Sequence, residues 1–284
     1  MPKTVSFRDA RLRSPVLRSL NALGAGLSGL GFELPVLDAD ALVAQAQRKA
    51  RSSRKPGAQL TEAMTRYIES AESESSLNFL GRMAVKNMLV NALGSHFAVE
   101  DWCESRQAVQ QEVIDRPWVV VGLPRTGTSI LSILMGLDPC NRHLMQWEAQ
   151  NPIPPSSLAS VNEDPRVAAC SERIGQLNKM NPTLASMHPF GSKLAEECTA
   201  VFLYAMRTIG METIAYTPSY GQWLDTADMA PAYAIHKQLL QALQHAQPSG
   251  SWILKSPNHL WCLPELLRAY PDARVIWTHR DPAK

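Results

Sequence analysis

The junction at residues 116–137 constrains the fold of this chain more than any other segment. Residues 118–121 (Trp-Val-Val-Val) are wholly apolar and mostly β-branched, which is typical of a strand buried on both faces. The loop Gly122-Leu-Pro-Arg-Thr-Gly-Thr-Ser129 follows, and residues 130–137 then read as a helix. A strand, a glycine-bearing loop and a helix N-terminus together hold anions on backbone N–H groups. The junction therefore predicts an anion site.

A second alternation near the end of the chain predicts how the sheet is built. Residues 251–254 and 273–278 read as strands, and residues 259–270 between them read as a helix. Such a unit implies parallel strands joined by a right-handed crossover. The predicted fold class is therefore α/β, a P-loop-like parallel sheet flanked by helices. The anion loop is expected at the carboxyl end of the sheet, where ligands bind in such folds.

The remainder of the chain is predicted to be mostly helical. The first part shows apolar positions three and four residues apart, which indicates a helical N-terminal subdomain over 1–115, before an α/β domain over 116–284. Residues 140–165 carry four prolines and are expected to form a loop. The individual helices are predicted at residues 37–50, 60–70, 77–93 (ending near Gly94), 166–180, 194–210 and 231–246.

Composition excludes several classes of protein. No run of about 18 apolar residues exists, so no transmembrane segment is predicted. The five cysteines are widely spaced without a C-x-x-C pair, which argues against a zinc site or a disulfide framework and favours a cytoplasmic protein. Five basic residues cluster without aromatic neighbours, so a solvated helix end is favoured over a nucleic-acid partner. They are Arg48, Lys49, Arg51, Arg54 and Lys55.

The anion loop departs from the loop of nucleoside triphosphatases in one position. Gly122 and Gly127 have the spacing of that pattern, but Thr128 stands where a lysine binds the β- and γ-phosphates. The cation lies instead at Arg125, inside the loop. This arrangement suits a single phosphate that carries one transferable group. A small-molecule kinase with a degenerate loop and an inactive nucleotide-binding fragment are the alternatives.

Three ordered motifs carry a resemblance to a known family. Pro124-Arg-Thr-Gly-Thr-Ser129 resembles the 5′-phosphosulfate loop of sulfotransferases, and the nearest branch is the bacterial sulfotransferases, similar in this loop to tyrosylprotein sulfotransferases. Leu254-Lys-Ser-Pro257 and Val275-Ile-Trp-Thr-His-Arg-Asp281 resemble two later family segments. In the family, the arginine that corresponds to Arg280 holds the 3′-phosphate of the donor, and a serine about eight residues later completes that site. This sequence stops at Lys284, and we expect a C-terminally truncated chain.

The resemblance implies a donor, a reaction and a set of donor-binding residues. The donor is 3′-phosphoadenosine-5′-phosphosulfate (PAPS), and the reaction moves its sulfuryl group to a hydroxyl or amine of a small-molecule or peptide acceptor, without a metal. Arg125 is expected to bridge phosphate and sulfate, Lys255 to act as second cation or leaving-group acid, and Arg280 to hold the 3′-phosphate. The donor-binding loop comprises Pro124, Arg125, Thr126, Gly127, Thr128 and Ser129.

A catalytic base must also remove the acceptor's proton. Glu148 lies near the position of the glutamate that follows the loop helix in the tyrosylprotein branch, and it is the predicted base. His188 is the alternative. Glu196 and Glu197 are expected on a helix, where adjacent positions do not share a face, so at most one of them would point into the acceptor cleft. Tyr220 and Trp223 are candidates for the cleft wall or for the core, and the histidines show no metal-ligand spacing.

Overall fold

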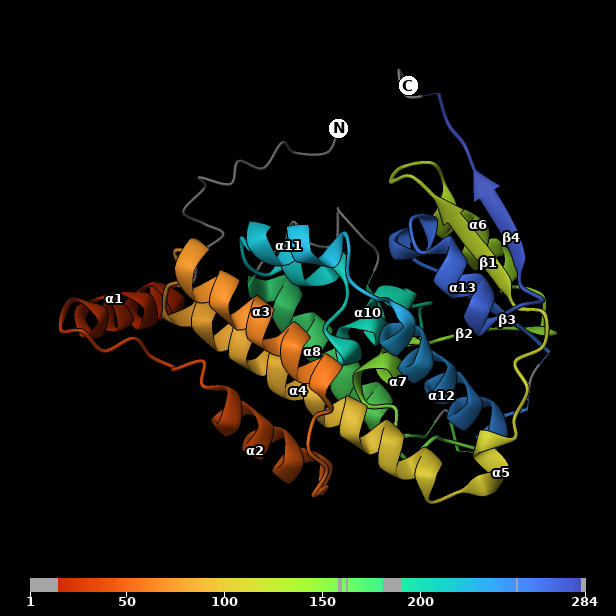
Figure 1. The fold of residues 1–284 in the computed structure, drawn as a ribbon, viewed down its shortest axis with the longest axis horizontal. Coiled ribbons are helices and arrows are strands. Elements are labelled where there is room, and N and C mark those ends of the chain that lie inside the picture. The colour runs from red at the N-terminus through yellow and green to blue at the C-terminus, as the bar shows by residue number, and fades with distance from the viewer. Residues whose placement is uncertain (1–14, 158–159, 162, 181–189, 249, 282–284) are drawn as a thin grey trace.

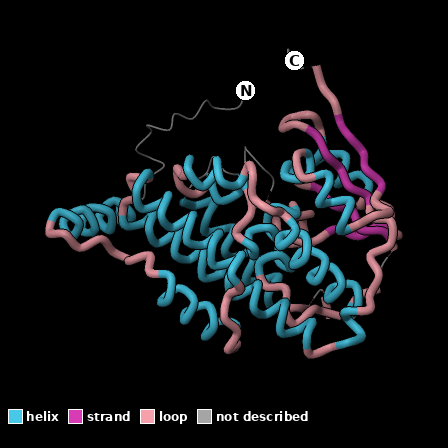
Figure 2. The backbone as a smooth tube through the Cα atoms, in the orientation of Figure 1, coloured by secondary structure: helices cyan, strands magenta, loops and turns pink. Residues whose placement is uncertain are grey.

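The computed structural model describes residues 15–157, 160–161, 163–180, 190–248 and 250–281. A four-stranded sheet lies at one end of the molecule and a group of helices fills the rest (Figures 1 and 2). The strands are β1 (Trp118–Gly122), β2 (Asn141–His143), β3 (Ser251–Lys255) and β4 (Arg274–Thr278). They are all parallel, in the order β2-β3-β1-β4. The predicted α/β class is confirmed.

The register of this sheet positions the anion loop. Val120 of β1 is opposite Lys255 of β3, and Gly122 at the end of β1 is opposite Thr278 of β4. Three carboxyl ends therefore meet where the loop begins. The loop continues into α6 (Thr128–Met135), which packs against β1 and β3. The crossover from β3 to β4 runs through η4 (Pro257–Leu260) and α13 (Leu263–Ala269).

The helices of the first part of the chain share one core with the sheet. The longest of them, α4 (Phe79–Glu104), packs against α2 (Ala39–Ala50) and against α12 (Ala230–Ala246) from the second part. One cluster of buried apolar side chains includes Phe97 of α4, Leu239 of α12 and Val119 of β1. The division into 1–115 and 116–284 stays a prediction. The other helical elements are α1 (Pro15–Gly29), α3 (Ala58–Glu74), α5 (Gln107–Gln110), α7 (Gln146–Gln150), α8 (Pro165–Met180), α10 (Cys198–Phe202), η2 (Leu203–Ala205), η3 (Ile209–Thr213) and α11 (Pro218–Leu224).

Most predicted elements are present, but four expectations about their extent are wrong. The helix expected to end near Gly94 continues to Glu104, because Gly94 is buried against α2 instead of capping a helix; a Cβ added to it would lie 3.6 Å from the Ala46 carbonyl oxygen. The expected loop 140–165 contains β2 and α7. The expected helix 194–210 breaks into α10, η2 and η3, since Met206 adopts a left-handed conformation. The expected helix 259–270 splits into η4 and α13.

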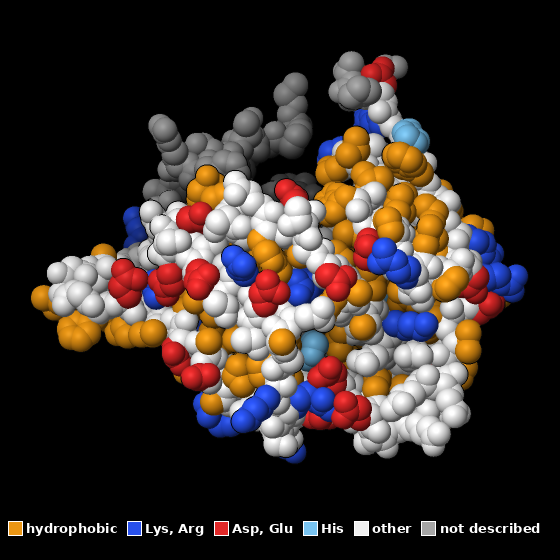
Figure 3. All heavy atoms as spheres, viewed as in Figure 1, with side chains coloured by type: hydrophobic (Ala, Val, Ile, Leu, Met, Phe, Trp, Pro, Cys, Tyr) orange, Lys and Arg blue, Asp and Glu red, His pale blue; other side chains and the backbone are white. Residues whose placement is uncertain are grey.

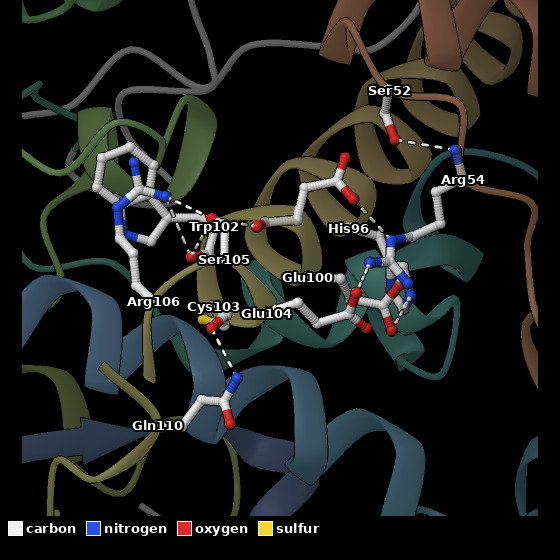
Figure 4. A network of polar contacts seen from close by, with 11 residues as sticks. Ser52, Arg54, His96, Glu100, Trp102, Cys103, Glu104, Ser105, Arg106 and Gln110 are labelled. Atoms are coloured by element: carbon white, nitrogen blue, oxygen red, sulfur yellow. Dashed lines mark hydrogen bonds and ion pairs between the residues drawn. The ribbon is translucent and has the colours of Figure 1, made fainter. Parts of the chain in front are cut away.

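Arg54, of the basic cluster at the end of α2, is bound to a neighbouring helix (Figure 4). The Arg54 Nε donates to Asp101 Oδ1 of α4 at 3.0 Å and lies 3.3 Å from Glu100 Oε2, and the Arg54 Nη2 contacts Glu104. His96 also contacts Glu100, at 3.4 Å. Arg54 therefore ties the loop after α2 to the acidic end of α4. No helix in the described residues is long and apolar enough to cross a membrane.

Candidate functional site

In the loop between β1 and α6, the backbone conformation and the close packing favour glycine at two positions. Gly127 has φ of 97°, and Arg125 has φ of 69°, so both lie in the left-handed region. Gly122 has no room for a side chain: a Cβ there would lie 2.4 Å from Thr278 Oγ1 and 2.9 Å from the Thr278 carbonyl oxygen. The Thr126 and Thr278 hydroxyls are 2.8 Å apart. β1 and β4 therefore approach closely where the loop begins, and α6, whose first N–H groups lack intrahelical partners, follows the loop directly.

Two cations from later strands join this loop. Lys255, at the carboxyl end of β3, is 8% exposed, and its Nζ donates to Ser129 Oγ at 3.2 Å. Arg280, just after β4, donates from Nη1 to the Arg125 carbonyl oxygen at 3.5 Å. The fold therefore places three predicted cations, Arg125, Lys255 and Arg280, around one helix N-terminus. A phosphate group with a second anionic group attached suits this charge.

The predicted base Glu148 is held in a separate buried network. Its side chain is 2% exposed; its Oε1 accepts from Arg142 Nη2 at 2.7 Å and its Oε2 accepts from the Met145 N–H at 3.0 Å. Arg142 also donates to the carbonyl oxygens of Leu243 and Gln247 at 3.0 and 3.1 Å. Both carboxylate oxygens are thus engaged. The role of Glu148 as base stays a prediction, and the alternative base His188 lies outside the described residues.

Glu196 and Glu197 do not lie on a helix, and the prediction that they do is wrong. Instead of lying on a helix, Ala195 forms an antiparallel bridge with Met145, and Glu196 N–H donates to the Leu144 carbonyl at 2.8 Å. This pairing brings Glu197 to Lys255, with which it forms an ion pair. Glu196 lines a small pocket beside Ser129 and Lys255. Both glutamates therefore reach the neighbourhood of Lys255.

Burial changes the titration of two groups in that small pocket. Burial raises the pKa of the Glu196 carboxyl, a shift that the nearby Glu197 charge reinforces and the Glu197 N–H and the Lys255 charge oppose. Burial also lowers the pKa of His143, which lines the same pocket. Both shifts are in the direction that stabilises the neutral form. Glu197 is the carboxylate that forms an ion pair with Lys255.

The candidate cleft residues Tyr220 and Trp223 belong to the core and its edge. The Tyr220 hydroxyl is buried and donates to the Met206 carbonyl oxygen at 3.0 Å, and its ring meets the Tyr67 ring at 5.2 Å between centroids. The Arg207 guanidinium lies over the Trp223 ring at 4.9 Å. These contacts assign the two side chains to packing.

The surroundings of the loop are apolar and exposed. Figure 3 shows hydrophobic side chains gathered over the end of the molecule that carries β1, β4 and α13. Exposed apolar residues here include Leu123 and Ile130 beside the loop and Trp277 of β4, which is 54% exposed. Among the described residues, no group of three or more His, Cys, Asp or Glu side chains could hold a metal ion. The cations that the structure places around the loop are Lys255 and Arg280, together with Arg125 of the loop itself.

Gly122→Ala is expected to disrupt this site. Its Cβ would meet the Thr278 backbone, which cannot move without separating β1 from β4. We expect the free energy of unfolding to fall by about 1–3 kcal/mol, the usual cost of overpacking, and anion binding to be lost. Urea denaturation measures the first effect. Gly175→Ala in α8 is the control, because open space surrounds that position and alanine favours a helix by up to ~1 kcal/mol. Equal stability of the two variants would contradict the steric argument.

The fold is that of an α/β protein with a P-loop-like loop at the carboxyl end of its sheet, and comparison with known proteins names its family. Residues 117–284 match the family described as "Sulfotransferase family", so the chain belongs to the sulfotransferase family. The crystal structure of sulfotransferase STF9 from Mycobacterium avium is similar, with a TM-score of 0.77 and 29% identity, over 88% of this chain and 64% of that chain. Sulfotransferase STF1 from Mycobacterium tuberculosis H37Rv has a TM-score of 0.77 and 28% identity, over 86% of this chain and 67% of that chain. No curated protein matches this chain.

The sequence-based family assignment is therefore confirmed. The chain spans about two thirds of the length of each of these two structures.

Proposed function

We propose that this protein transfers the sulfuryl group of PAPS to a hydroxyl or amine of an acceptor. The observation that carries the proposal is the convergence of Arg125, Lys255 and Arg280 on the N-terminus of α6. A phosphosulfate and a 3′-phosphate are separate anionic groups on one nucleotide, and these cations come from separate elements that could meet them. Membership of the sulfotransferase family supports the proposal.

The roles of the loop residues follow from their positions. Backbone N–H groups of Thr126, Gly127, Thr128 and Ser129 would hold the 5′-phosphate, in a loop whose direction Pro124 and Gly122 help to set. The Arg125 guanidinium has the planar fork that binds two oxygens together, and Arg280 is the group for the 3′-phosphate. Lys255 would meet the charge that develops on the oxygen between phosphorus and sulfur when the bond to sulfur breaks.

Thr128 argues against the kinase alternative. Its place at the start of α6 is the place where a triphosphatase loop carries its lysine. The cation that does reach the loop from the sheet, Lys255, contacts Ser129, the position at which a triphosphatase needs a free hydroxyl to bind Mg²⁺. A phosphosulfate donor needs neither group.

Ligand titration tests the proposal directly. We expect 3′,5′-adenosine bisphosphate to bind and to raise the melting temperature, since a ligand at 100 times its Kd stabilises the folded state by about 2.7 kcal/mol. ATP with Mg²⁺ should leave both calorimetric heat and melting temperature unchanged. A response to ATP with Mg²⁺ alone would favour the kinase, and a folded protein that responds to neither ligand would contradict the proposed function.

The proposal includes a cytoplasmic location. All five cysteines are free, and four of them are buried, as is typical of a protein in a reducing compartment. Oxidation-state analysis of the protein isolated from cells under thiol-blocking conditions would test this. Extensive disulfide formation among these cysteines would contradict it.

A further inference from the structure

The helix α1 projects from one side of the group of helices (Figure 1) and packs little against the rest of the chain. None of its fifteen residues, all of them in the described part of the chain, is buried. Three of these residues are glycines, and each glycine in a helix interior costs up to ~1 kcal/mol relative to alanine. Most helical stability in proteins comes from packing of an apolar face. A single copy of the chain therefore gives α1 little of the support that such a helix needs.

The contacts that α1 makes with α4 involve small and polar residues. The Leu80 N–H of α4 donates to Asn21 Oδ1 at 3.2 Å. Gly24, one turn further along α1, lies so close to α4 that a side chain there would collide with Phe79. The face of α1 that carries Asn21 and Gly24 is therefore turned toward α4, and its orientation is fixed by these contacts.

The leucines of α1 lie beside that face and are exposed to solvent. They follow each other at intervals of four and three residues, which is the 3.5-residue period of a coiled-coil seam. This leucine stripe comprises Val16, Leu20, Leu23, Leu27 and Leu30, which are between 38% and 74% exposed. Figure 3 shows apolar side chains along the free edge of α1. The flanking residues Ser19 and Gly26 are small and uncharged, and a Cβ added to Gly26 would meet no atom within 4 Å, so a second helix has room to approach.

We propose that the leucine stripe binds the leucine stripe of a second copy of this chain, so that the protein forms a two-fold dimer. A two-fold interface needs only one self-complementary patch, and this uncharged stripe brings no like charges together. The exposed apolar surface continues past the helix through Phe32, Leu34 and Val36, which are 61%, 41% and 59% exposed. Together with the stripe, these residues expose an area on the order of the ~800 Å² per partner that a standard interface buries.

A lipid surface is the less suitable partner for the stripe. Helices that lie on membranes carry lysine and arginine on their polar face. Arg18 is the one charged residue among the fifteen of α1. The pocket beside α1 is lined by the carboxylates of Glu33 and Glu72, which share Arg82 as their counter-charge. The local charge therefore offers little attraction to an anionic lipid surface.

Leu23→Glu tests the proposal at the middle of the stripe. Leu23 is the third of the five stripe residues, so it meets its own counterpart whether the two helices run parallel or antiparallel. Sedimentation equilibrium of the unaltered protein should give a mass about twice the 31.4 kDa of one chain. In Leu23→Glu we expect the Kd of the dimer to rise by roughly 100-fold or more, because association would bury two carboxylates without partners. Leu23→Met should keep the dimer.

Two further variants separate loss of the interface from loss of the fold. Leu267→Glu is the matched control, because Leu267 is 44% exposed on α13, at the end of the molecule that carries the sheet, and it should dimerise as the unaltered protein does (Figure 1). Leu23→Cys, in a chain whose exposed Cys140 is replaced by alanine, should form a disulfide-linked dimer on mild oxidation. The melting temperature of Leu23→Glu in dilute solution should match that of the dissociated unaltered protein, since Leu23 is 69% exposed in the single chain.

Three results would overturn the proposal. The first is an unaltered protein that stays monomeric at every concentration accessible to centrifugation. The second is a dimer that Leu267→Glu dissociates and Leu23→Glu does not, which would place the interface at the other end of the molecule. The third is a monomer that floats with phosphatidylglycerol vesicles and loses this binding in Leu23→Glu, which would assign the stripe to a lipid surface.

Discussion

Replacing Arg125 by alanine is expected to weaken binding of 3′,5′-adenosine bisphosphate by roughly 30-fold to several thousand-fold, since losing one partner of a desolvated charge pair costs about 2–5 kcal/mol. The side chain is exposed in the donor-free protein, so the fold should not depend on it. Alanine and arginine also tolerate the positive φ of this position about equally. The loss should therefore be one of affinity alone, measured by calorimetric titration with an unchanged melting temperature.

Two further substitutions sharpen this result. Arg125→Lys keeps the charge but loses the planar fork, so we expect its affinity to lie between those of the unaltered protein and the alanine variant. Arg268→Ala removes an arginine whose side chain is 70% exposed on α13 and should leave the affinity unchanged. Unaltered affinity in Arg125→Ala would show that the loop is only a turn between β1 and α6, and the donor assignment would have to be abandoned.

Replacing Arg142 by methionine is expected to lower the free energy of unfolding by about 3–5 kcal/mol, the cost of leaving a buried charge without its partner. Arg142 is the counter-charge of Glu148, its guanidinium lies 4.7 Å from the centre of the Trp252 ring, and it binds two carbonyl oxygens at the end of α12. Methionine would keep most of the volume and none of these hydrogen bonds. Urea denaturation of both proteins measures the difference.

The double variant Arg142→Met with Glu148→Gln provides the internal comparison. Removing both charges should restore part of the lost stability, because no uncompensated charge then remains. Arg116→Met breaks a surface pair with Asp115 in which both side chains are 63% exposed, and it should change stability little. A small effect of Arg142→Met, similar to that of Arg116→Met, would contradict the view that this pair anchors β2 to α7 and α12.

The anion loop and most of the regular elements were accessible from local sequence signals. A β-branched apolar run predicts β1, the strand–helix–strand unit of residues 251–278 predicts β3 and β4, and the spacing of apolar residues predicts α2, α3 and α12. The loop motif also identified Arg125 and its neighbours, because glycine spacing and cation position are read along a single short segment. Lys255 and Arg280 followed from the resemblance of residues 254–257 and 275–281 to sulfotransferase segments. Both lie at carboxyl ends of strands, which a parallel sheet brings together.

Elements stabilised by distant partners were missed or misjudged. The strand β2 has only three residues, too few for an alternating pattern, and exists because it pairs with β3. The helix α4 continues through Gly94 because α2 packs on that glycine, whereas a glycine by itself suggests a helix end. In both cases the element is stabilised by a contact with a segment far away in the sequence, and the pattern of neighbouring residues gives no sign of that contact.

The sequence by itself determined the α/β class, the family and the anion loop with its cations, because periodicity, turn residues and motif spacing are local properties. The tertiary structure alone decided that Glu197 reaches Lys255 across 58 residues of chain, that Thr126 meets Thr278 across 152, and that Glu148 is committed to Arg142. These contacts depend on strand order and on the pairing of residues 144–147 with 192–196. Both arise from packing the whole core, and no short segment encodes them.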